Sequence, residues 1–428
     1  MSAILTPCAG YKHTILIKED GVKKGGCYDE YDTIYCPSLQ DALMHNDLTD
    51  SCIFLFERNT SYVINSLVTL NNVKHFALEA ELSNQTIQCA NATGCGVQFK
   101  NCIDVLITNM TFSFSVAAQV TSLLTPIPTP ISSLLTFYQC DDVILSSINF
   151  IRVTGHSVVV ADSSNIVANA IEVEGGVGSG FLVIFKEKDG ISIDLSRVTF
   201  QDIRVDNKSE SNKSIYNATS PAGKGAGLSV FFLKHVTMDN IRCYQCSFKR
   251  NKAIFGSGIF LYMAHGTRNN NVLINETVFD SNEAWASGGG MYISSSHMKS
   301  NLVHITDSNF TNNKAEHASG GGALFTYNSH LTMSGRVSVT ENTGTAMVLG
   351  ATLLEVRSGA DINITGNSGV LGGAMFLFKC PTINVCNSSN VLFSRNWADA
   401  DGGALFVFHE FEKKASRCFF DPQYRFVL

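Results

Sequence analysis

A short motif recurs along most of the chain and limits the folds that it can adopt. Glycine clusters precede apolar runs that begin at Phe181, Leu228, Ile259, Met291, Ala323, Met347, Ala374 and Ala404, in steps of 47, 31, 32, 32, 24, 27 and 30 residues. A second marker, an apolar residue three positions before an asparagine, reads Phe248/Asn251, Phe279/Asn282, Phe310/Asn313, Val339/Asn342, Ile364/Asn367 and Phe393/Asn396. Two independent markers that keep one phase indicate a repeat unit of about 30 residues.

One unit, residues 303–327, shows what each repeat can form. Val303, Ile305 and, after a break in phase, Phe310 alternate with polar residues, which predicts a strand with one buried face. A polar stretch follows, then three glycines that allow positive φ, then a second strand in Ala323–Tyr327. Antiparallel hairpins would need two-residue Asn-Gly loops, and a propeller blade needs about 40–45 residues. We therefore predict an all-β fold, a single-stranded right-handed parallel β-helix (solenoid) of roughly a dozen coils.

Neighbouring coils of such a solenoid bury each other's apolar faces, so equivalent residues should lie in columns. Matching positions are held by Phe325, Phe376 and Phe406, and by Tyr327, Phe378 and Phe408. We expect one set to point inward and the other to lie on the outer face. The marker asparagines should adopt left-handed turn conformations and hydrogen-bond to the adjacent coil.

Five segments depart from the repeat. Residues 1–37 form a cysteine-containing N-terminal segment, and the β-helix is predicted over 38–420, with 421–428 as a truncated end. Surface loops are predicted at about 121–133, which holds three of the eight prolines, and at about 206–222, which is polar. Ser38–His45 reads as a short amphipathic helix with Asp41 in a weak capping box, placed to cover the open end of the core.

Composition points to an extracellular setting. The chain has 31 Lys and Arg against 37 Asp and Glu, a net charge of −6, and no basic block, which disfavours nucleic-acid partners. It has 13 cysteines, an odd number, so at least one is unpaired within the chain. Candidate N-glycosylation sites are Asn59, Asn84, Asn91, Asn109, Asn207, Asn212, Asn217, Asn275, Asn309, Asn363 and Asn387. Sequons and cysteines together favour an oxidising, secretory route.

The chain ends do not match that route. Met1–Gly10 has neither the basic region nor the apolar core of a signal peptide, and no run reaches the roughly 18 apolar residues of a membrane span. We expect a fragment that lacks a leader peptide and a C-terminal region. A cytosolic protein is the competing explanation.

The repeat has a family resemblance. The pairing of F-x-x-N with GGA-[LM]-F, over about 248–408, resembles the repeat of chlamydial-type polymorphic outer-membrane proteins. The wider pattern, from CPSLQDAL through IQCANATGCGVQFKNCIDVLITNMTF, looks like the animal right-handed β-helix repeat proteins of the pectin-lyase-like superfamily. The resemblance implies a β-helix with an adhesive role, but this fold hosts lyases, hydrolases, adhesins and structural proteins.

Polysaccharide cleavage is the alternative function. Glycoside hydrolases need two carboxyl groups, and Asp141, Asp142 and, in the Gly155–Ser157 turn, His156 faintly resemble polygalacturonase motifs. The Asn-Thr-Asp and Arg-Ile-Lys elements of those enzymes are missing, and the same residues read as an ordinary turn before a strand. For a lyase, the basic run Lys249–Lys252 lies at a turn where solvated charge is the simpler explanation.

The cysteines and glycines suggest no further chemistry. Cys243 and Cys246 lack a second pair for zinc and are better explained by a disulfide, as are Cys89, Cys95 and Cys102 and the pair Cys380 and Cys386. We therefore expect no catalytic, cofactor-binding or metal-binding residues. The predicted function is a non-enzymatic extracellular adhesion, recognition or structural module, with glycans or cell-surface proteins as partners, without nucleic acid and without a membrane span. The alternative is a polysaccharide-degrading lyase or glycoside hydrolase of the same fold.

Overall fold

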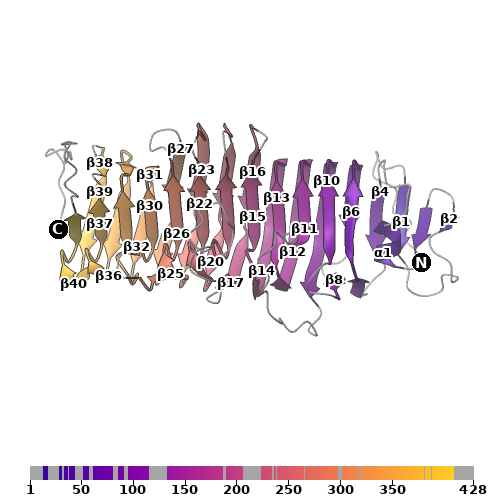
Figure 1. Ribbon diagram of the computed structural model, residues 1–428, viewed down its shortest axis with the longest axis horizontal. Coiled ribbons are helices and arrows are strands. Elements are labelled where there is room, and N and C mark those ends of the chain that lie inside the picture. Colours follow the sequence, from indigo (N-terminus) through magenta and orange to yellow (C-terminus); the bar gives the residue numbers. More distant parts are fainter. Residues whose placement is uncertain are drawn as a thin grey trace. The chain divides into compact units, whose positions relative to one another are not determined.

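The computed structural model describes most of the chain. The described residues are 13–17, 28–30, 33–36, 38–43, 52–56, 61–80, 85–90, 95–114, 133–186, 189–205, 223–233, 236–237, 239–264, 266–296, 301–317, 320–379, 381–386 and 388–408. The chain divides into two units, residues 1–177 and 178–428, and each unit is described by itself. Nearly all described elements are β-strands (Figure 1).

The strands of the first unit form parallel stacks. One stack pairs β6 (Leu67–Asn71), β9 (Gly96–Lys100), β11 (Ser133–Tyr138) and β13 (His156–Ala161) in that order. The other strands are β1 (His13–Ile17), β2 (Tyr28–Glu30), β3 (Thr33–Cys36), β4 (Cys52–Phe56), β5 (Ser61–Ile64), β7 (Lys74–Glu79), β8 (Gln85–Cys89), β10 (Ile103–Phe114), β12 (Asp141–Thr154) and β14 (Ser164–Val177). Among the described pairings of this unit, that of β2 with β3 is antiparallel.

The second unit has four parallel stacks. The first contains β15 (Phe181–Phe185), β18 (Leu228–Phe232), β22 (Ile259–Met263), β26 (Met291–Ser295), β30 (Leu324–Tyr327), β33 (Met347–Gly350), β37 (Met375–Phe378) and β41 (Leu405–Phe408). The second contains β16 (Ser192–Ser196), β19 (Asn240–Tyr244), β23 (Asn270–Asn275), β27 (Asn301–Thr306), β31 (His330–Ser334), β34 (Leu353–Val356) and β38 (Thr382–Val385). The third contains β17 (Thr199–Val205), β20 (Ser247–Lys249), β24 (Val278–Asp280), β28 (Asn309–Thr311), β32 (Arg336–Thr340), β35 (Asp361–Thr365) and β39 (Asn390–Ser394). Short strands form the fourth: β21 (Lys252–Phe255), β25 (Glu283–Ser287), β29 (Lys314–Ala315), β36 (Ser368–Leu371) and β40 (Trp397–Asp401).

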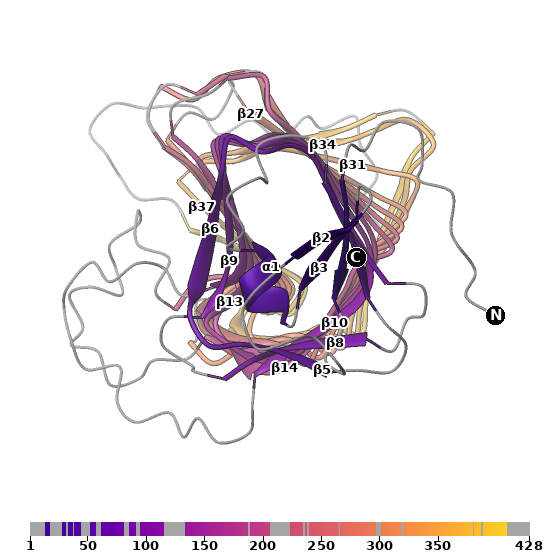
Figure 2. The ribbon, with the colours of Figure 1, turned by 90° about the vertical axis from the view of Figure 1, so that its right-hand side faces the viewer.

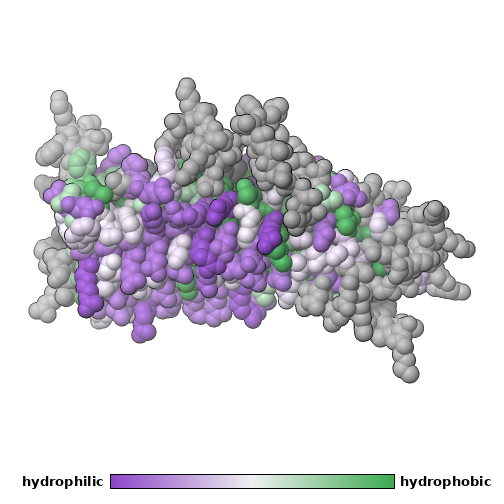
Figure 3. All heavy atoms as spheres, turned by 90° about the horizontal axis from the view of Figure 1, so that it is seen from below, coloured by the Kyte–Doolittle hydropathy of each residue, from purple (hydrophilic) through white to green (hydrophobic). Residues whose placement is uncertain are grey.

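Successive coils therefore pair in parallel, strand on equivalent strand, which confirms the predicted right-handed parallel β-helix. The face of the second unit drawn in Figure 3 includes the region of β25, β36 and β40, labelled along the lower edge of Figure 1, and its described surface is mainly hydrophilic. Among the described residues, no helix has the length and apolar character needed to cross a membrane.

The marker phenylalanines form an inward column. Phe248, Phe279 and Phe310 are in register on β20, β24 and β28 and are buried. Their rings stack with centroids 5.0 and 4.4 Å apart. Each coil thus covers the ring of the preceding coil, and burial of apolar area stabilises the stack.

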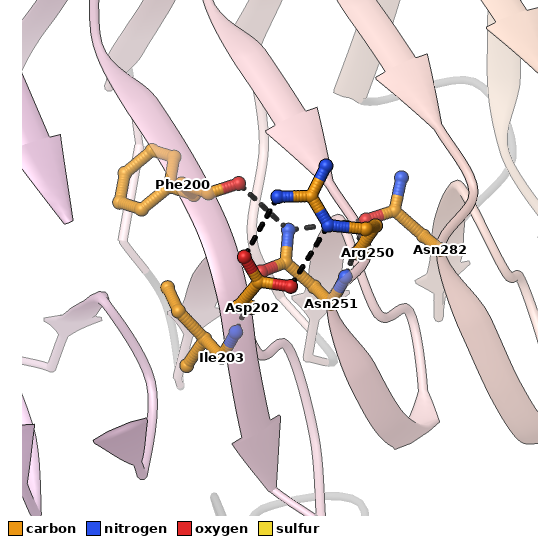
Figure 4. A network of polar contacts seen from close by, with 6 residues as sticks. All are labelled: Phe200, Asp202, Ile203, Arg250, Asn251 and Asn282. Atoms are coloured by element: carbon orange, nitrogen blue, oxygen red, sulfur yellow. Dashed lines mark hydrogen bonds and ion pairs between the residues drawn. The ribbon is translucent and has the colours of Figure 1, made fainter. Parts of the chain in front are cut away.

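The marker asparagines form a buried ladder beside that column (Figure 4). The amide nitrogen of Asn251 donates to the carbonyl oxygen of Phe200 at 2.9 Å and to the side-chain oxygen of Asn282 at 3.0 Å. The side-chain oxygen of Asn251 accepts the backbone N–H of Ile203 at 3.1 Å. The same pattern continues through Asn313, Asn342, Asn367 and Asn396.

The predicted conformation of these asparagines was wrong. The left-handed residue is the one before each ladder position, as at Arg250, Ser281 and Asn312, with φ of 50°, 57° and 55°. The ladder asparagine itself must turn its side chain into the stack. The preceding residue, whose side chain faces outward, therefore makes the turn.

The glycine clusters give the aromatic column its space. A Cβ atom on Gly290 would lie 2.6 Å from the carbonyl oxygen of Ala323 and 2.9 Å from the ring of Phe310. Gly258 has the same relation to Phe279, at 2.9 Å. Gly288, the first glycine of its cluster, has φ of +71°, as predicted for a tight turn.

The two outer aromatic sets lie on one face, which corrects the expectation of opposite faces. Phe325 and Tyr327 are two residues apart in β30, and side chains repeat their direction every two residues in a strand. Their neighbours Leu324 and Thr326 are the buried ones. Phe376 is in register with Phe406, as predicted. The rings of Tyr292 and Phe325 stack at 4.9 Å, so this outer strip is itself packed.

A short helix, α1 (Leu39–Leu43), is present where a helix over Ser38–His45 was predicted. The hydroxyl oxygen of Ser38 accepts the backbone N–H of Asp41 at 3.0 Å, as expected of a capping box. Figure 2 shows α1 inside the outline of the first unit's strands, and it contacts β3, β5 and β6. Its role as a cover for the core stays a prediction. The loops predicted at 121–133 and 206–222 lie, apart from Ser133, outside the described residues.

Replacement of Gly290 by alanine should destabilise the fold. The added methyl group has no space between the carbonyl oxygen of Ala323 and the ring of Phe310. We expect Gly290→Ala to cost about 1–3 kcal/mol and to lower the thermal unfolding midpoint. Gly403→Ala is the matched control, because its nearest atom beyond the chain neighbours is the carbonyl oxygen of Asn396 at 3.5 Å. Equal midpoints for the two variants would contradict the packing argument.

Candidate binding groove

The second stack of the second unit presents its outward side chains in two columns. In β16, β19, β23 and β27, alternate residues such as Ile193, Ile241 and Val272 are buried. The residues between them therefore face outward. Register places Ser192, Asn240, Asn271 and Leu302 in one column and Asp194, Arg242, Leu273 and His304 in the next.

These columns line a groove of about 470 Å³. That volume lies within the range of small-molecule sites, roughly 300–1,000 Å³. The groove crosses four successive strands, so it extends roughly 14 Å along the stack. An elongated ligand can lie along it, with one contact row for each coil.

Polar groups converge at the β16–β19 end of the groove. The guanidinium of Arg242 lies 3.3 Å from the carboxylate of Asp194 across adjacent coils. The amide nitrogen of Asn271 donates to the side-chain oxygen of Asn240 at 3.3 Å. Both side chains of the Arg242–Asp194 pair are more than one-third exposed, so they retain capacity for a ligand.

Apolar and imidazole groups line the other end. Leu273 and Leu302 are half-buried on β23 and β27. His304 lies within 2.7 Å of the Ser334 hydroxyl oxygen, from its Nε2 atom. Burial, and secondarily the charge of Arg357, lowers the pKa of His304, so this imidazole is neutral at pH 7. The groove therefore joins hydrogen-bonding groups to an apolar patch.

A polar strip continues past the groove onto β31 and β34. The Nε2 atom of His330 lies 3.2 Å from the carboxylate of Glu355, and Arg357 lies 3.8 Å from the same carboxylate. Thr332 of β31, in register with Glu355 of β34, is fully buried. The outer face of this stack is thus polar over several coils, unlike the aromatic outer strip of the first stack.

The catalytic alternative placed Asp141, Asp142 and His156 together, and the structure separates them. Asp141 and Asp142 begin β12, and the side-chain amide of Asn165 donates to the carboxylate of Asp142 at 3.0 Å. Asp142 has φ of 58° and Asn165 of 54°, so both occupy the same left-handed turn position in successive coils. His156 is the first residue of β13, and the last residue, Ala161, accepts a hydrogen bond from the backbone N–H of Gln139, close to Asp141. The length of β13, roughly 17 Å, therefore separates His156 from Asp141.

The cysteines agree in part with the expected disulfides. Cys89 is bonded to Cys95, and Cys243 to Cys246. Cys102 is an unbonded, buried thiol, which corrects its assignment to the first group, and Cys386 is also unbonded. Cys380 lies outside the described residues.

Four predicted sequons fall on described residues. Asn309 is exposed on β28, and Asn109, Asn275 and Asn363 are half-buried. The others, Asn59, Asn84, Asn91, Asn207, Asn212, Asn217 and Asn387, lie outside the described residues. Glycosylation at all of these sites stays a prediction.

One sequence family matches the chain. The Chlamydia polymorphic membrane protein repeat matches residues 307–327, within the predicted repeat region. The match spans a single repeat, and it confirms the resemblance stated from F-x-x-N and GGA-[LM]-F. No curated protein matches the chain.

Similar solved structures are distant in sequence. The catalytic domain of a GH87 α-1,3-glucanase in complex with nigerose is 10% identical, with a TM-score of 0.45 over 94% of this chain and 67% of that one. The surface protein and adhesin PfbA of Streptococcus pneumoniae is 12% identical, with a TM-score of 0.42 over 87% of this chain and 94% of that one. A second PfbA structure has 10% identity and a TM-score of 0.34, over 86% of this chain and 87% of that one.

The groove residues were missed in the sequence because no motif marks them. A signal was available in the spacing. Asp194, Arg242, Leu273 and His304 are separated by 48, 31 and 31 residues, close to the steps of the glycine clusters. Once the phase of the repeat is fixed, those steps place the four residues in one outward column.

The lowered pKa of His304 predicts a pH dependence of stability. The unfolded chain binds a proton at this histidine near pH 6.5, whereas the folded chain does so only at lower pH. Stability should therefore fall as the pH is lowered from about 7.5 to about 5. His304→Gln should lose less stability than the parent over that interval, measured by denaturant unfolding. Parallel pH profiles would show that the environment of His304 does not shift its pKa.

Proposed function

We propose that this protein is an extracellular or cell-surface recognition protein that binds glycan chains in the groove over β16, β19, β23 and β27. The observation that carries the proposal is the elongated groove itself, which is lined by two columns of outward side chains. A glycan presents hydroxyl groups and C–H faces along its length. Amide, carboxylate and guanidinium groups can bond the hydroxyls, and Leu273 and Leu302 can contact the C–H faces.

The charge pattern favours binding over hydrolysis. Glycoside hydrolysis commonly uses two carboxyl groups roughly 5–9.5 Å apart on either side of the bond. Among the described residues that line the groove, the one carboxylate is Asp194, and it is paired with Arg242. This pair orients polar atoms for a ligand but leaves no second acid beside it.

The setting is supported by chemistry that belongs to the secretory route. Local disulfides, Cys89–Cys95 and Cys243–Cys246, form in oxidising compartments. The match to a polymorphic membrane protein repeat is consistent with display at a cell surface. We include N-glycosylation at the predicted sequons in the same proposal.

Removal of the Arg242 side chain should weaken glycan binding. We would titrate the secreted chain with a panel of neutral and acidic polysaccharides, in the presence of Ca²⁺, and follow both retention and product formation. For the glycan that binds, Arg242→Ala should raise Kd by about 10- to 100-fold, because a charged hydrogen bond contributes about 1.5–3 kcal/mol.

The matched control is Arg250→Ala. Arg250 forms a closer pair with Asp202 across adjacent coils, at 2.7 Å, and both side chains are similarly exposed, but it does not line the groove (Figure 4). We expect Kd for this variant to stay within about 2-fold of the parent value. An equal loss of glycan affinity in both variants would show that the glycan does not bind in the groove. New reducing ends or unsaturated uronate products would replace the proposal with the enzymatic alternative.

Glycosylation is tested best at Asn309. This asparagine is exposed at the start of β28, where an attached glycan meets solvent. Asn309→Gln should remove one glycan from the secreted chain, seen as a single mass step before and after enzymatic deglycosylation. An unchanged mass would show that this sequon is not used.

A further inference from the structure

Two buried thiols of the first unit lie outside the groove and outside the observed disulfides. Cys102 follows β9, and Cys140 follows β11, the next strand of the same stack. Both side chains are 0% exposed, and both are unbonded in the structure. They occupy equivalent positions in successive coils.

Backbone hydrogen bonds hold these two positions beside each other. The N–H of Asn101, just before Cys102, donates to the carbonyl oxygen of Tyr138 at 3.0 Å. The N–H of Asp141, just after Cys140, donates to the carbonyl oxygen of Cys102 at 2.9 Å. Neighbouring parallel strands lie roughly 4.8 Å apart, and disulfide-bonded cysteines have Cα atoms about 4.4–6.8 Å apart. The spacing of the two coils is therefore suited to a disulfide.

The turns around the cysteines also superimpose. Asn101 and Gln139, the residues just before them, have nearly equal φ angles of 54° and 53°. The two Cα–Cβ bonds thus leave the backbone in the same way. Asp162, with φ of 47°, precedes Ser163 in the third coil of this series, so the column continues with a hydroxyl in place of a thiol.

The two sulfur atoms share a polar environment. The Cys102 sulfur lies 3.4 and 3.5 Å from the carbonyl oxygens of Lys100 and Leu70, and the Cys140 sulfur lies 3.4 and 3.5 Å from those of Phe99 and Tyr138, within hydrogen-bonding distance for a thiol. The Cys140 thiol also contacts the Cys102 sulfur. This contact lowers the pKa of Cys102 to about 7 and, together with burial, raises that of Cys140. In the folded chain, Cys102 is therefore the member of the pair that ionises first.

We propose that Cys102 and Cys140 become joined by a disulfide between successive coils when the chain folds in an oxidising compartment. The thiolate of one of the two cysteines attacks the disulfide of a thiol–disulfide oxidoreductase and forms a mixed disulfide. The sulfur of the other cysteine, once deprotonated, displaces the enzyme sulfur. The two cysteines together lose two protons and two electrons, and the oxidoreductase leaves as a dithiol. The exchange precedes closure of the core, because the folded coils exclude solvent from both sulfurs.

This inference does not depend on the groove and is tested by the state of two thiols. No Lys or Arg lies between Lys100 and Arg152, so trypsin releases both cysteines in one peptide, residues 101–152. The full chain would be secreted behind an added leader, unfolded in an alkylating reagent without reductant, deglycosylated and digested. We expect that peptide without alkyl groups and two hydrogens lighter than its reduced form. Two alkyl groups on the peptide would overturn the proposal.

Serine variants separate this pairing from bonds to other cysteines. Cys140→Ser should fold, because Ser163 already holds the equivalent position in a neighbouring coil. We expect its peptide 101–152 to carry one alkyl group, on Cys102, and Cys102→Ser to carry one on Cys140. A serine variant whose remaining cysteine resists alkylation would show a partner elsewhere and would refute the coil-to-coil bond. The proposal also predicts a lower unfolding midpoint for either variant than for the unreduced parent.

Discussion

In the second unit, the stacking of one coil on the next depends on hydrogen bonds from buried asparagine side chains. A turn in a solenoid leaves backbone groups that neither strand of the coil can pair, and burial makes each unpaired group cost about 1–3 kcal/mol. The amide of Asn282 satisfies a carbonyl oxygen on one coil, a backbone N–H on the same neighbour, and the next asparagine of the column. Asparagine suits this position because its short side chain is both donor and acceptor. Because each bond spans two coils, the ladder also fixes their register.

The phenylalanine beside each asparagine explains why the two sequence markers keep one phase. Its ring fills the corner of the coil and lies against a glycine of the cluster that begins the same turn of the helix. Alanine holds that glycine position at Ala323, Ala346 and Ala374. In the first two of these coils the ring position is held by the smaller Val339 and Ile364, whereas the third coil keeps Phe393. In two coils, therefore, a smaller side chain accompanies the added methyl group, as close packing favours.

Repetition is also why the fold, and only part of the surface, could be read from the sequence. Inward positions are alike from coil to coil, so residues such as Phe248, Phe279 and Asn282 can be recognised in the sequence by their regular spacing. Outward positions are free to differ, and a column such as Asp194, Arg242, Leu273 and His304 has no motif to find. Two local errors had the same origin, since a pattern of residue types does not give direction. The positive φ angle was predicted for the ladder asparagine. The side chain of that asparagine must point into the core, whereas the residue with positive φ is the preceding one, whose side chain points outward. Phe325 and Tyr327 were divided between two faces, although a spacing of two residues puts both on one.

The faint resemblance of Asp141, Asp142 and His156 to polygalacturonase motifs shows why short motifs are weak evidence of catalysis in a β-helix. Asp142 belongs to a column of turn residues that contains His75, Asp104 and Asn165, each with φ between 54° and 58°. Asp104 pairs with His75 at 2.7 Å, and Asn165 bonds Asp142 at 3.0 Å. A left-handed turn selects asparagine, aspartate and histidine for backbone reasons, so acidic and imidazole groups accumulate there without any chemistry to perform. The groove differs in that its side chains stand on extended strands, where the backbone imposes no such choice. Polar residues there, at positions where each coil is free to vary, are better evidence of a ligand than polar residues at a turn.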